Sequence, residues 1–520
     1  MNTKQLMQKS FPFIAFVAGI TYFCLRILGF DLAFIPGDLG DSRFINFLLE
    51  HGYQWLNGDI DNFWDGRFMY PFQNTIALSD SMLGTLPIYY LFRLLNFSPE
   101  TSYQLWWISI YTLNFWLSYF IFKKWFQKPI IAVVLAYIFA FSIFNLGQLN
   151  YMQMAIRFMV PVVFYAAYKL VATPSLKYLS IYCFGLVFQI YCVAYTGFYL
   201  LYFSALFIGI YCLLSKNWTV FTYFFKKEKR LYTSALFLAS ALALLWLLLP
   251  YQAMSKIVGL RWYREAIVNL PLWNSYLFPH EASITWRFLF DWAKPNVTEW
   301  WLHSVFAGII PLFAILIPPF YLLYHLFKKI TMPLLLKSLI ITSSIIVLLH
   351  IRTEGGLSLY TLIFKLPGIN SMRVLSRFMH VELFLLLLLF GYFLERIKTQ
   401  HFIFVVLLIV VDNLFSTDYI PREPKAALIA RKEKIIQLVE KSGTTQFKAV
   451  ALIHQNQAHF VTHIDMMLAA QQIGVKTING YSSFCPDEFG EFFLENSESG
   501  LQKWLESNSI KKEEVLVVSD

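Results

Sequence analysis

Long apolar runs separated by polar stretches constrain this chain more than any other feature. Runs of about 20 mostly apolar residues, the length that crosses a bilayer as a helix, recur as far as residue 416. They cover residues 11–30, 105–122, 130–146, 156–172, 178–196, 197–214, 231–250, 303–326, 333–350, 377–394 and 401–416. With 58% hydrophobic and 14% charged residues, the chain has more apolar surface than one soluble core can bury. The pattern predicts an α-helical polytopic membrane protein with about 11 spans and excludes a soluble globular enzyme.

Basic residues between the runs predict the orientation, because cytoplasmic loops are enriched in Lys and Arg. Lys4 and Lys9 precede the first run and predict a cytoplasmic N-terminus. The later basic groups fall on the same side only if the doubtful run 81–97 does not span. These groups are Lys123, Lys124 and Lys128, Lys177, Lys226 to Arg230, Lys328 and Lys329, and Arg396 with Lys398. We therefore expect residues 81–97 to lie at the outer interface.

This topology divides the chain into two parts. The first is a transmembrane domain, residues 1–416, whose long external loops are 31–104 and 251–302. The second is residues 417–520, which we expect outside the membrane.

The second part has short elements in place of long apolar runs. Ile420 to Pro424 contains two prolines and is predicted to be a linker. Predicted elements are a helix at 425–441, a strand at 448–453, a helix at 463–473 ended by Gly474, and short strands at 475–478 and 514–518. The order predicts a small extracytoplasmic α/β module. This part carries more acidic than basic residues, although the whole chain has a net charge of +10, so no soluble basic surface indicates nucleic-acid binding.

Carboxylates stand at two points of the first external loop. Asp38 and Asp41 follow the first run, and an amphipathic stretch after them is typical of a helix on the membrane surface. A carboxylate held there can act as a general base toward an acceptor hydroxyl. Asp41 or Ser42 can equally be the N-cap of that helix. Asp80, at the start of the 81–97 run, has the same two interpretations.

Two groups of arginines are candidates for binding a phosphate. Arg373, Arg377 and His380 share one face if their segment is helical, and ionisable groups at membrane depth are functional by default. The alternative is that the two arginines extend to the interface. Arg261 and Arg264 can bind a phosphate or pair with neighbouring acids. No His and Cys cluster has zinc-site spacing, so no metal and no cofactor is predicted.

Several short segments, in this order, resemble motifs of bacterial GT-C-type integral membrane glycosyltransferases, which depend on polyprenyl-phosphate sugars. Those in the first loop are Gly37 to Ser42, Phe68 to Thr75 and Ser79 to Gly84. Those further along are Leu149 to Gln153, Leu366 to Phe378 and Ile478 to Phe484. Together the segments extend over most of the chain.

The resemblance implies a GT-C-like fold and an inverting transfer of a hexosyl or pentosyl group. The donor would be a polyprenyl-phosphate-linked sugar, and the acceptor an extracytoplasmic glycan, lipid or protein at the bacterial inner (cytoplasmic) membrane. It also implies that Asp41 is the catalytic carboxylate, with Asp38 and Asp80 as further candidates, and that Arg373 and Arg377 face the donor phosphate. Some enzymes of this type use a divalent metal and others do not.

Two other functions remain open, a transporter or lipid flippase and a non-catalytic membrane scaffold. Transporters place ionisable residues near the membrane midplane, often in repeated broken helices. The apolar runs here are nearly free of charge and no internal repeat is visible, which favours the enzyme.

Overall fold

The computed structural model describes residues 3–296, 299–443, 447–453, 458–482 and 484–519. Within these residues, eight helical segments are long and apolar enough to cross a membrane. They are Ser10–Leu28, Pro99–Trp125, Pro129–Gln148, Met152–Ala172, Ala194–Ser215, Lys227–Val258, Ile309–Phe327 and Leu375–Leu394. Three shorter apolar helical segments follow the same pattern, Leu176–Cys192, Leu334–Leu349 and Thr399–Asp412. The prediction of a helical polytopic membrane protein is confirmed at this level.

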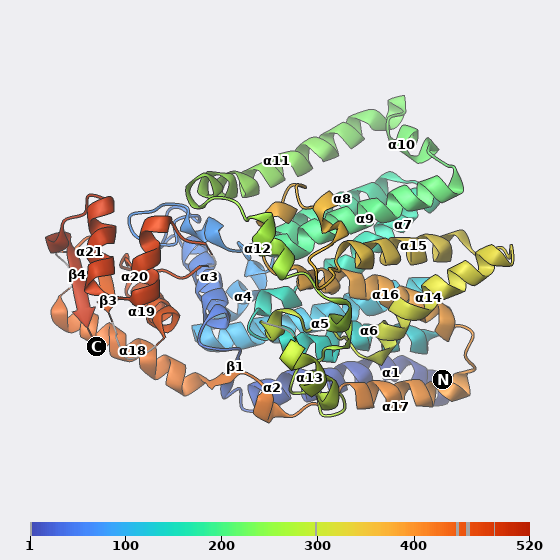
Figure 1. The fold of residues 1–520 in the computed structure, drawn as a ribbon, viewed down its shortest axis with the longest axis horizontal. Helices are drawn as coiled ribbons and strands as arrows, with labels where there is room; N and C mark the ends of the chain where they lie inside the picture. The colour runs from blue at the N-terminus through green and yellow to red at the C-terminus, as the bar shows by residue number, and fades with distance from the viewer. Residues whose placement is uncertain (1–2, 297–298, 444–446, 454–457, 483, 520) are drawn as a thin grey trace.

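Figure 1 shows the long helices running together across the molecule, with the C-terminal elements gathered at one end beside α3 and α4. The helices of the bundle are α1 (Thr3–Gly19), α2 (Arg26–Leu28), α5 (Pro99–Trp125), α6 (Pro129–Phe141), α7 (Met159–Ala172), α8 (Leu176–Cys192), α9 (Ala194–Ser215), α10 (Thr219–Phe224), α11 (Lys227–Val258), α14 (Ile309–Phe327), α15 (Leu334–Leu349), α16 (Met379–Leu394) and α17 (Phe402–Asp412).

Helix α16 is the centre of the bundle. It packs against α6, α7, α9, α14 and α15, and its run Leu383 to Leu389 is buried on every side. A helix that is apolar all round is expected in such a position. Because α16 begins at Met379, the residues just before it, Arg373 to Phe378, are fixed at one end of the bundle.

The first external loop folds into two helices, α3 (Asp41–Leu56) and α4 (Leu86–Leu94). Helix α4 has nine residues and is about 14 Å long, too short for a hydrocarbon core of about 30 Å. Arg93 of α4 forms an ion pair with Glu50 of α3 at 2.9 Å. The loop at 259–302 contains α12 (Tyr263–Val268) and α13 (Arg287–Ala293).

The amphipathic pattern of α3 predicted a helix whose apolar side rests on a membrane surface. In the structure that side is covered by protein instead. The helix packs against α4 and α5 on one side and against α19 (His459–Ile473) on the other. Phe44, Phe47 and Leu48 are buried by these contacts. Amphipathicity specifies that one face is covered, and the tertiary structure decides that protein covers it.

The C-terminal residues form helices around a parallel pair of strands. The elements are α18 (Lys425–Ser442), β3 (Ala449–Ile453), α19, α20 (Gly490–Glu495), α21 (Glu498–Ser507) and β4 (Val515–Ser519). Strands β3 and β4 pair in parallel from Ala449 opposite Val515 to Ile453 opposite Ser519. The helices and strands expected at 425–441, 448–453, 463–473 and 514–518 are present within one to four residues. The expected strand at 475–478 is reduced to a bridge between Thr477 and Val450.

The predicted linker at 420–424 is partly wrong. Arg422–Pro424 forms strand β2, which pairs antiparallel with β1 (Phe34–Pro36) after the first helix. Pro424 and Pro36 lie at the ends of these two three-residue strands, where a missing backbone donor is tolerated. The pairing joins the start of the C-terminal part to the loop that carries Asp38 and Asp41.

Candidate functional site

Asp41 is the first residue of α3, and its carboxylate points to the C-terminal part of the chain. Its Oδ1 accepts a hydrogen bond of 3.0 Å from the hydroxyl of Tyr481. No described residue donates to Oδ2. Burial raises the pKa of Asp41 to about 6, against the opposing effects of the Arg377 charge and the Tyr481 hydrogen bond. Half-buried and poised near neutrality, this carboxylate has the properties of a general base.

Asp38 shapes the loop before α3. Its Oδ1 accepts the Gly40 N–H at 2.9 Å, and its own N–H donates to Asn150 Oδ1 at 3.1 Å. Gly37 beside it has φ +91°, and a Cβ there would lie 2.9 Å from the Leu149 carbonyl oxygen, so glycine is required. Burial raises the pKa of Asp38. These bonds bring two predicted motifs, 37–42 and 149–153, into contact.

Asp80 caps a helix, but a different one from the helix expected. Its Oδ1 accepts the N–H of Ala194 at 2.8 Å, and Ala194 is the first residue of α9. A carboxylate at a helix N-terminus satisfies a donor that has no partner within the helix. Burial raises the pKa of Asp80 to about 6, while the Ala194 hydrogen bond and the charge of Arg377 act in the opposite direction.

Arg377 is buried, at 8% exposure, without a carboxylate partner among the described residues. Its guanidinium carbon lies 4.5 Å from the ring centre of Tyr151 and 4.8 Å from that of Tyr195. Its Nε is buried and has no hydrogen-bond partner. Two cation–π contacts hold the charge in place, and its electrostatic interactions reach Asp41 and Asp80.

The segment around Arg373 and Arg377 is not the helix that their spacing required. Residues Leu375–Phe378 form a 3₁₀ turn, and Arg373 precedes it in irregular backbone. The Arg373 N–H donates to the Tyr195 hydroxyl at 2.8 Å, and its charge acts on Asp41 together with that of Arg377. The charges of both arginines therefore act on one carboxylate, although the predicted helix face does not exist.

His380 separates from this group. It is buried inside the bundle, where its Nδ1 lies 2.9 Å from the guanidinium of Arg157. Arg157 also donates to Asn145 Oδ1 at 2.8 Å. Two residues further along α16, Glu382 is buried and accepts a hydrogen bond from Ser343. Arg157 and Glu382 were not predicted as site residues, although both lie within predicted apolar runs.

The two arginines of the second loop differ from each other. Arg261 forms an ion pair with Glu265 at 2.5 Å, lies 3.7 Å above the Phe484 ring and interacts electrostatically with Arg373. Arg264 is exposed and forms no ion pair with a described residue. Electrostatic interactions therefore link Asp38, Asp41, Asp80, Arg261, Arg373 and Arg377, and Arg264 has no such interaction with them.

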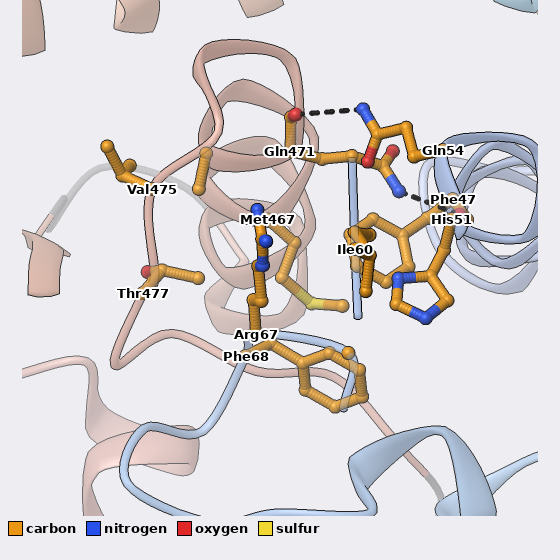
Figure 2. Close-up of a pocket in the computed structure, with 12 residues that line it drawn as sticks. Phe47, His51, Gln54, Ile60, Arg67, Phe68, Met467, Gln471, Val475 and Thr477 are labelled. Carbon is orange, nitrogen blue, oxygen red and sulfur yellow. Dashed lines mark hydrogen bonds between the residues drawn. The ribbon is translucent and has the colours of Figure 1, made fainter. Parts of the chain in front are cut away.

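Two cavities lie along the first external loop, and none of the candidate site residues lines either of them. Figure 2 shows one between α3 and α19. There the Gln54 side chain donates to the Gln471 carbonyl, and the Gln471 side chain donates to the Phe47 carbonyl. Its volume of about 10 Å³ is too small for a substrate. The other, of about 250 Å³, is lined by Asp65, Arg67, Tyr70, Pro71, Phe72, Gln73 and Lys476. Among the described residues no group of three His, Cys, Asp or Glu could hold a metal ion.

The sequence analysis also missed three tyrosines that define the site, Tyr151, Tyr195 and Tyr481. Tyr151 and Tyr481 lie within segments that resemble known motifs, which was the available signal. No protein-family model matches the chain, and no curated protein is significantly similar to it in sequence.

Proposed function

We propose that the protein is a membrane glycosyltransferase of the GT-C type, which moves a sugar from a polyprenyl-phosphate donor to an external acceptor with inversion. The observation that carries the proposal is that the charge of Arg377 acts on Asp41 although the two side chains form no ion pair. A carboxylate with one free oxygen and a pKa of about 6 lies near a buried arginine that has no acidic partner among the described residues. Such an arginine is suited to a phosphate.

In the proposed reaction, Asp41 Oδ2 takes the proton of an acceptor hydroxyl as that oxygen attacks the anomeric carbon of the donor sugar. The bond between the anomeric carbon and the phosphate oxygen breaks, and its electron pair stays on that oxygen. The products are the glycosylated acceptor, a polyprenyl phosphate and protonated Asp41. Attack from the face opposite the phosphate inverts the anomeric configuration.

The arginines supply the countercharge for the leaving phosphate. Arg377 is held between Tyr151 and Tyr195, and Arg373 is held through its backbone by Tyr195. A fixed charge stabilises developing negative charge without reorganising during the reaction. Arg261 interacts electrostatically with Arg373, but its own charge is paired with Glu265.

The proposed topology has 11 spans, made of the eight long and three shorter apolar helices. It places the N-terminus in the cytoplasm and the site, with residues 417–520, on the outer side of the bacterial inner membrane. The basic residues between the helices support this orientation. A lipid-linked donor would reach the site from within the bilayer.

The test uses purified protein with synthetic polyprenyl phosphates that each carry one hexose or pentose, and it measures the release of polyprenyl phosphate. Asp41→Asn should lower the rate by a factor on the order of 10²–10⁴, the usual contribution of a general base. Asp59→Asn, an exposed carboxylate of the same loop, is the matched control and should retain the rate. Full activity of Asp41→Asn, or no release by the wild-type protein from any donor, would contradict the proposal.

One observation favours a second function, transport of a lipid or ion. Arg157, His380 and Glu382 are buried within apolar helical segments, and ionisable groups in such positions often mark a transport pathway. In proteoliposomes, a flippase would move a fluorescent polyprenyl-phosphate sugar across the bilayer. Movement that Arg157→Met abolishes and Asp41→Asn preserves would favour transport over transfer.

A further inference from the structure

The segment Thr477–Ser482 is built into the first external loop. The Tyr70 N–H donates to the Thr477 carbonyl at 3.0 Å, and the Thr477 N–H donates to the Arg67 carbonyl at 2.9 Å. On the other side, the Ile478 N–H donates to the Val450 carbonyl of β3 at 2.9 Å. The segment therefore lies between the first loop and the C-terminal strands and is bonded to both.

The backbone on each side of Tyr481 is also fixed. The Gly480 N–H donates to His463 Nδ1 at 3.1 Å, and a Cβ on Gly480 would lie 2.2 Å from Met69 Cγ. The Ser482 hydroxyl donates to the Leu78 carbonyl at 2.9 Å. Burial lowers the pKa of His463 to about 3, so its ring stays neutral and its Nδ1 remains an acceptor.

The ring of Tyr481 is held by aromatic side chains. Its centre lies 5.4 Å from that of Phe44 on α3, and 6.4 Å from those of Phe460 and Phe493. Burial, followed by the neighbouring Asp41 charge, raises the pKa of Tyr481. The hydroxyl therefore keeps its proton near neutral pH and can only donate to Asp41, at the 3.0 Å separation of the two oxygens.

We infer that Tyr481 is a positioning residue for Asp41, and that the C-terminal part of the chain therefore belongs to the reaction centre. This inference rests on the proposed function. By holding Oδ1, the tyrosine leaves Oδ2 for the acceptor hydroxyl and fixes the direction in which it points. Its donated hydrogen bond also stabilises the ionised carboxylate, the form that acts as a base.

Other charged and titratable groups face Asp41 as well, and each stays unchanged in the test. Arg377 and Arg373 come from the segment before α16, and Asp38 from the loop before α3. Tyr103 of α5 and Tyr151 of the 149–153 segment also interact with the carboxylate. A shift of the Asp41 titration midpoint in a variant changed only at Tyr481 therefore measures the effect of the Tyr481 hydroxyl.

The test compares Tyr481→Phe, which removes only the hydroxyl, with Tyr419→Phe, a matched control at an exposed tyrosine far along the chain from the site segment. The protonated carboxyl band of Asp41 is followed by infrared spectroscopy against pH, with Asp41→Asn in each background as the reference. Loss of a hydrogen bond to a charged group should raise the Asp41 midpoint by about one pH unit in Tyr481→Phe alone. An unchanged midpoint overturns the inference.

The second measurement is the pH profile of kcat/KM with the synthetic polyprenyl-phosphate sugars. Tyr481→Phe should move the acid limb to higher pH by the same interval and lower kcat more than it raises KM. An infrared shift without any activity of the wild-type protein would refute the transferase and leave the Tyr481–Asp41 contact standing. Activity with an unmoved acid limb would refute the positioning role and leave the transferase standing.

Discussion

At the scale of single residues, three carboxylates with similar sequence surroundings have different partners. One carboxylate oxygen of Asp38 accepts the backbone N–H of Gly40, and one of Asp80 accepts that of Ala194. Asp41 instead accepts a hydrogen bond from the side-chain hydroxyl of Tyr481. Asp38 and Asp80 therefore stabilise local backbone, whereas the bonded oxygen of Asp41 contacts a side chain from the C-terminal part. The helix-cap interpretation therefore holds for Asp80, at α9, and not for Asp41.

Asparagine substitution distinguishes these roles. Asp80→Asn keeps an oxygen that can accept the Ala194 N–H, so we expect an unchanged melting temperature and less than about a tenfold loss of transferase activity. Asp80→Ala removes the cap of α9 and should cost about 1 kcal/mol of stability. Thermal unfolding in detergent and the release assay measure the two effects. A loss of activity in Asp80→Asn as large as that in Asp41→Asn would make Asp80 a catalytic group.

At the scale of elements, α3 is held in position by α19. Arg43 of α3 and Asp465 of α19 form an ion pair at 2.5 Å, with both side chains at least 97% buried. Asp465 also pairs with Arg431 of α18 at 2.6 Å. Since Asp41 begins α3, the position of the carboxylate depends on this buried contact.

Breaking the contact should destabilise the protein strongly. Arg43→Ala leaves Asp465 buried with one partner and should cost roughly 3–5 kcal/mol, the range for removing one side of a buried pair. Lys503→Ala breaks a more exposed pair with Glu491 and should cost no more than about 1 kcal/mol. Denaturant unfolding followed by tryptophan fluorescence provides the comparison. Equal effects of the two changes would show that the buried pair does not anchor α3.

At the scale of the whole molecule, the site is assembled from distant parts of the chain. Asp41 and Tyr481 are 440 positions apart, and Arg43 and Asp465 are 422 apart. The central helix α16 fixes the arginines, and the first loop and the C-terminal elements close around the carboxylate. In the proposed topology of 11 spans, the first loop, the C-terminal elements and the start of α16 lie on the outer side of the membrane.

Thiol labelling tests that topology. In a Cys485→Ser background, where the other cysteines are buried, Ser499→Cys places a thiol at an exposed site of α21 and Lys227→Cys places one at the start of α11. A membrane-impermeant maleimide added to spheroplasts should label Ser499→Cys and should label Lys227→Cys only after lysis. The opposite pattern, or labelling of both in intact spheroplasts, would contradict the proposed orientation.

Local features of the sequence determined the helical elements of the bundle. Each of the predicted apolar runs overlaps an apolar helical segment, because hydrophobic length is a property of neighbouring residues. Local sequence also predicted helix α18 and strand β3. The predictions were wrong where bonds to distant segments set the backbone. These places are β2, which pairs with β1, and residues 373–378, where Tyr195 and Tyr151 hold the arginines.

The sequence by itself determined a helical membrane protein and named the carboxylates and arginines that could carry chemistry. Only the tertiary structure decided that Asp80 caps α9, that Arg264 is exposed and that the Tyr481 hydroxyl donates to Asp41. Composition and periodicity report which surfaces must be buried. They do not specify which segments meet, since a hydrogen bond or a cation–π contact depends on a few ångströms between residues that are hundreds of positions apart.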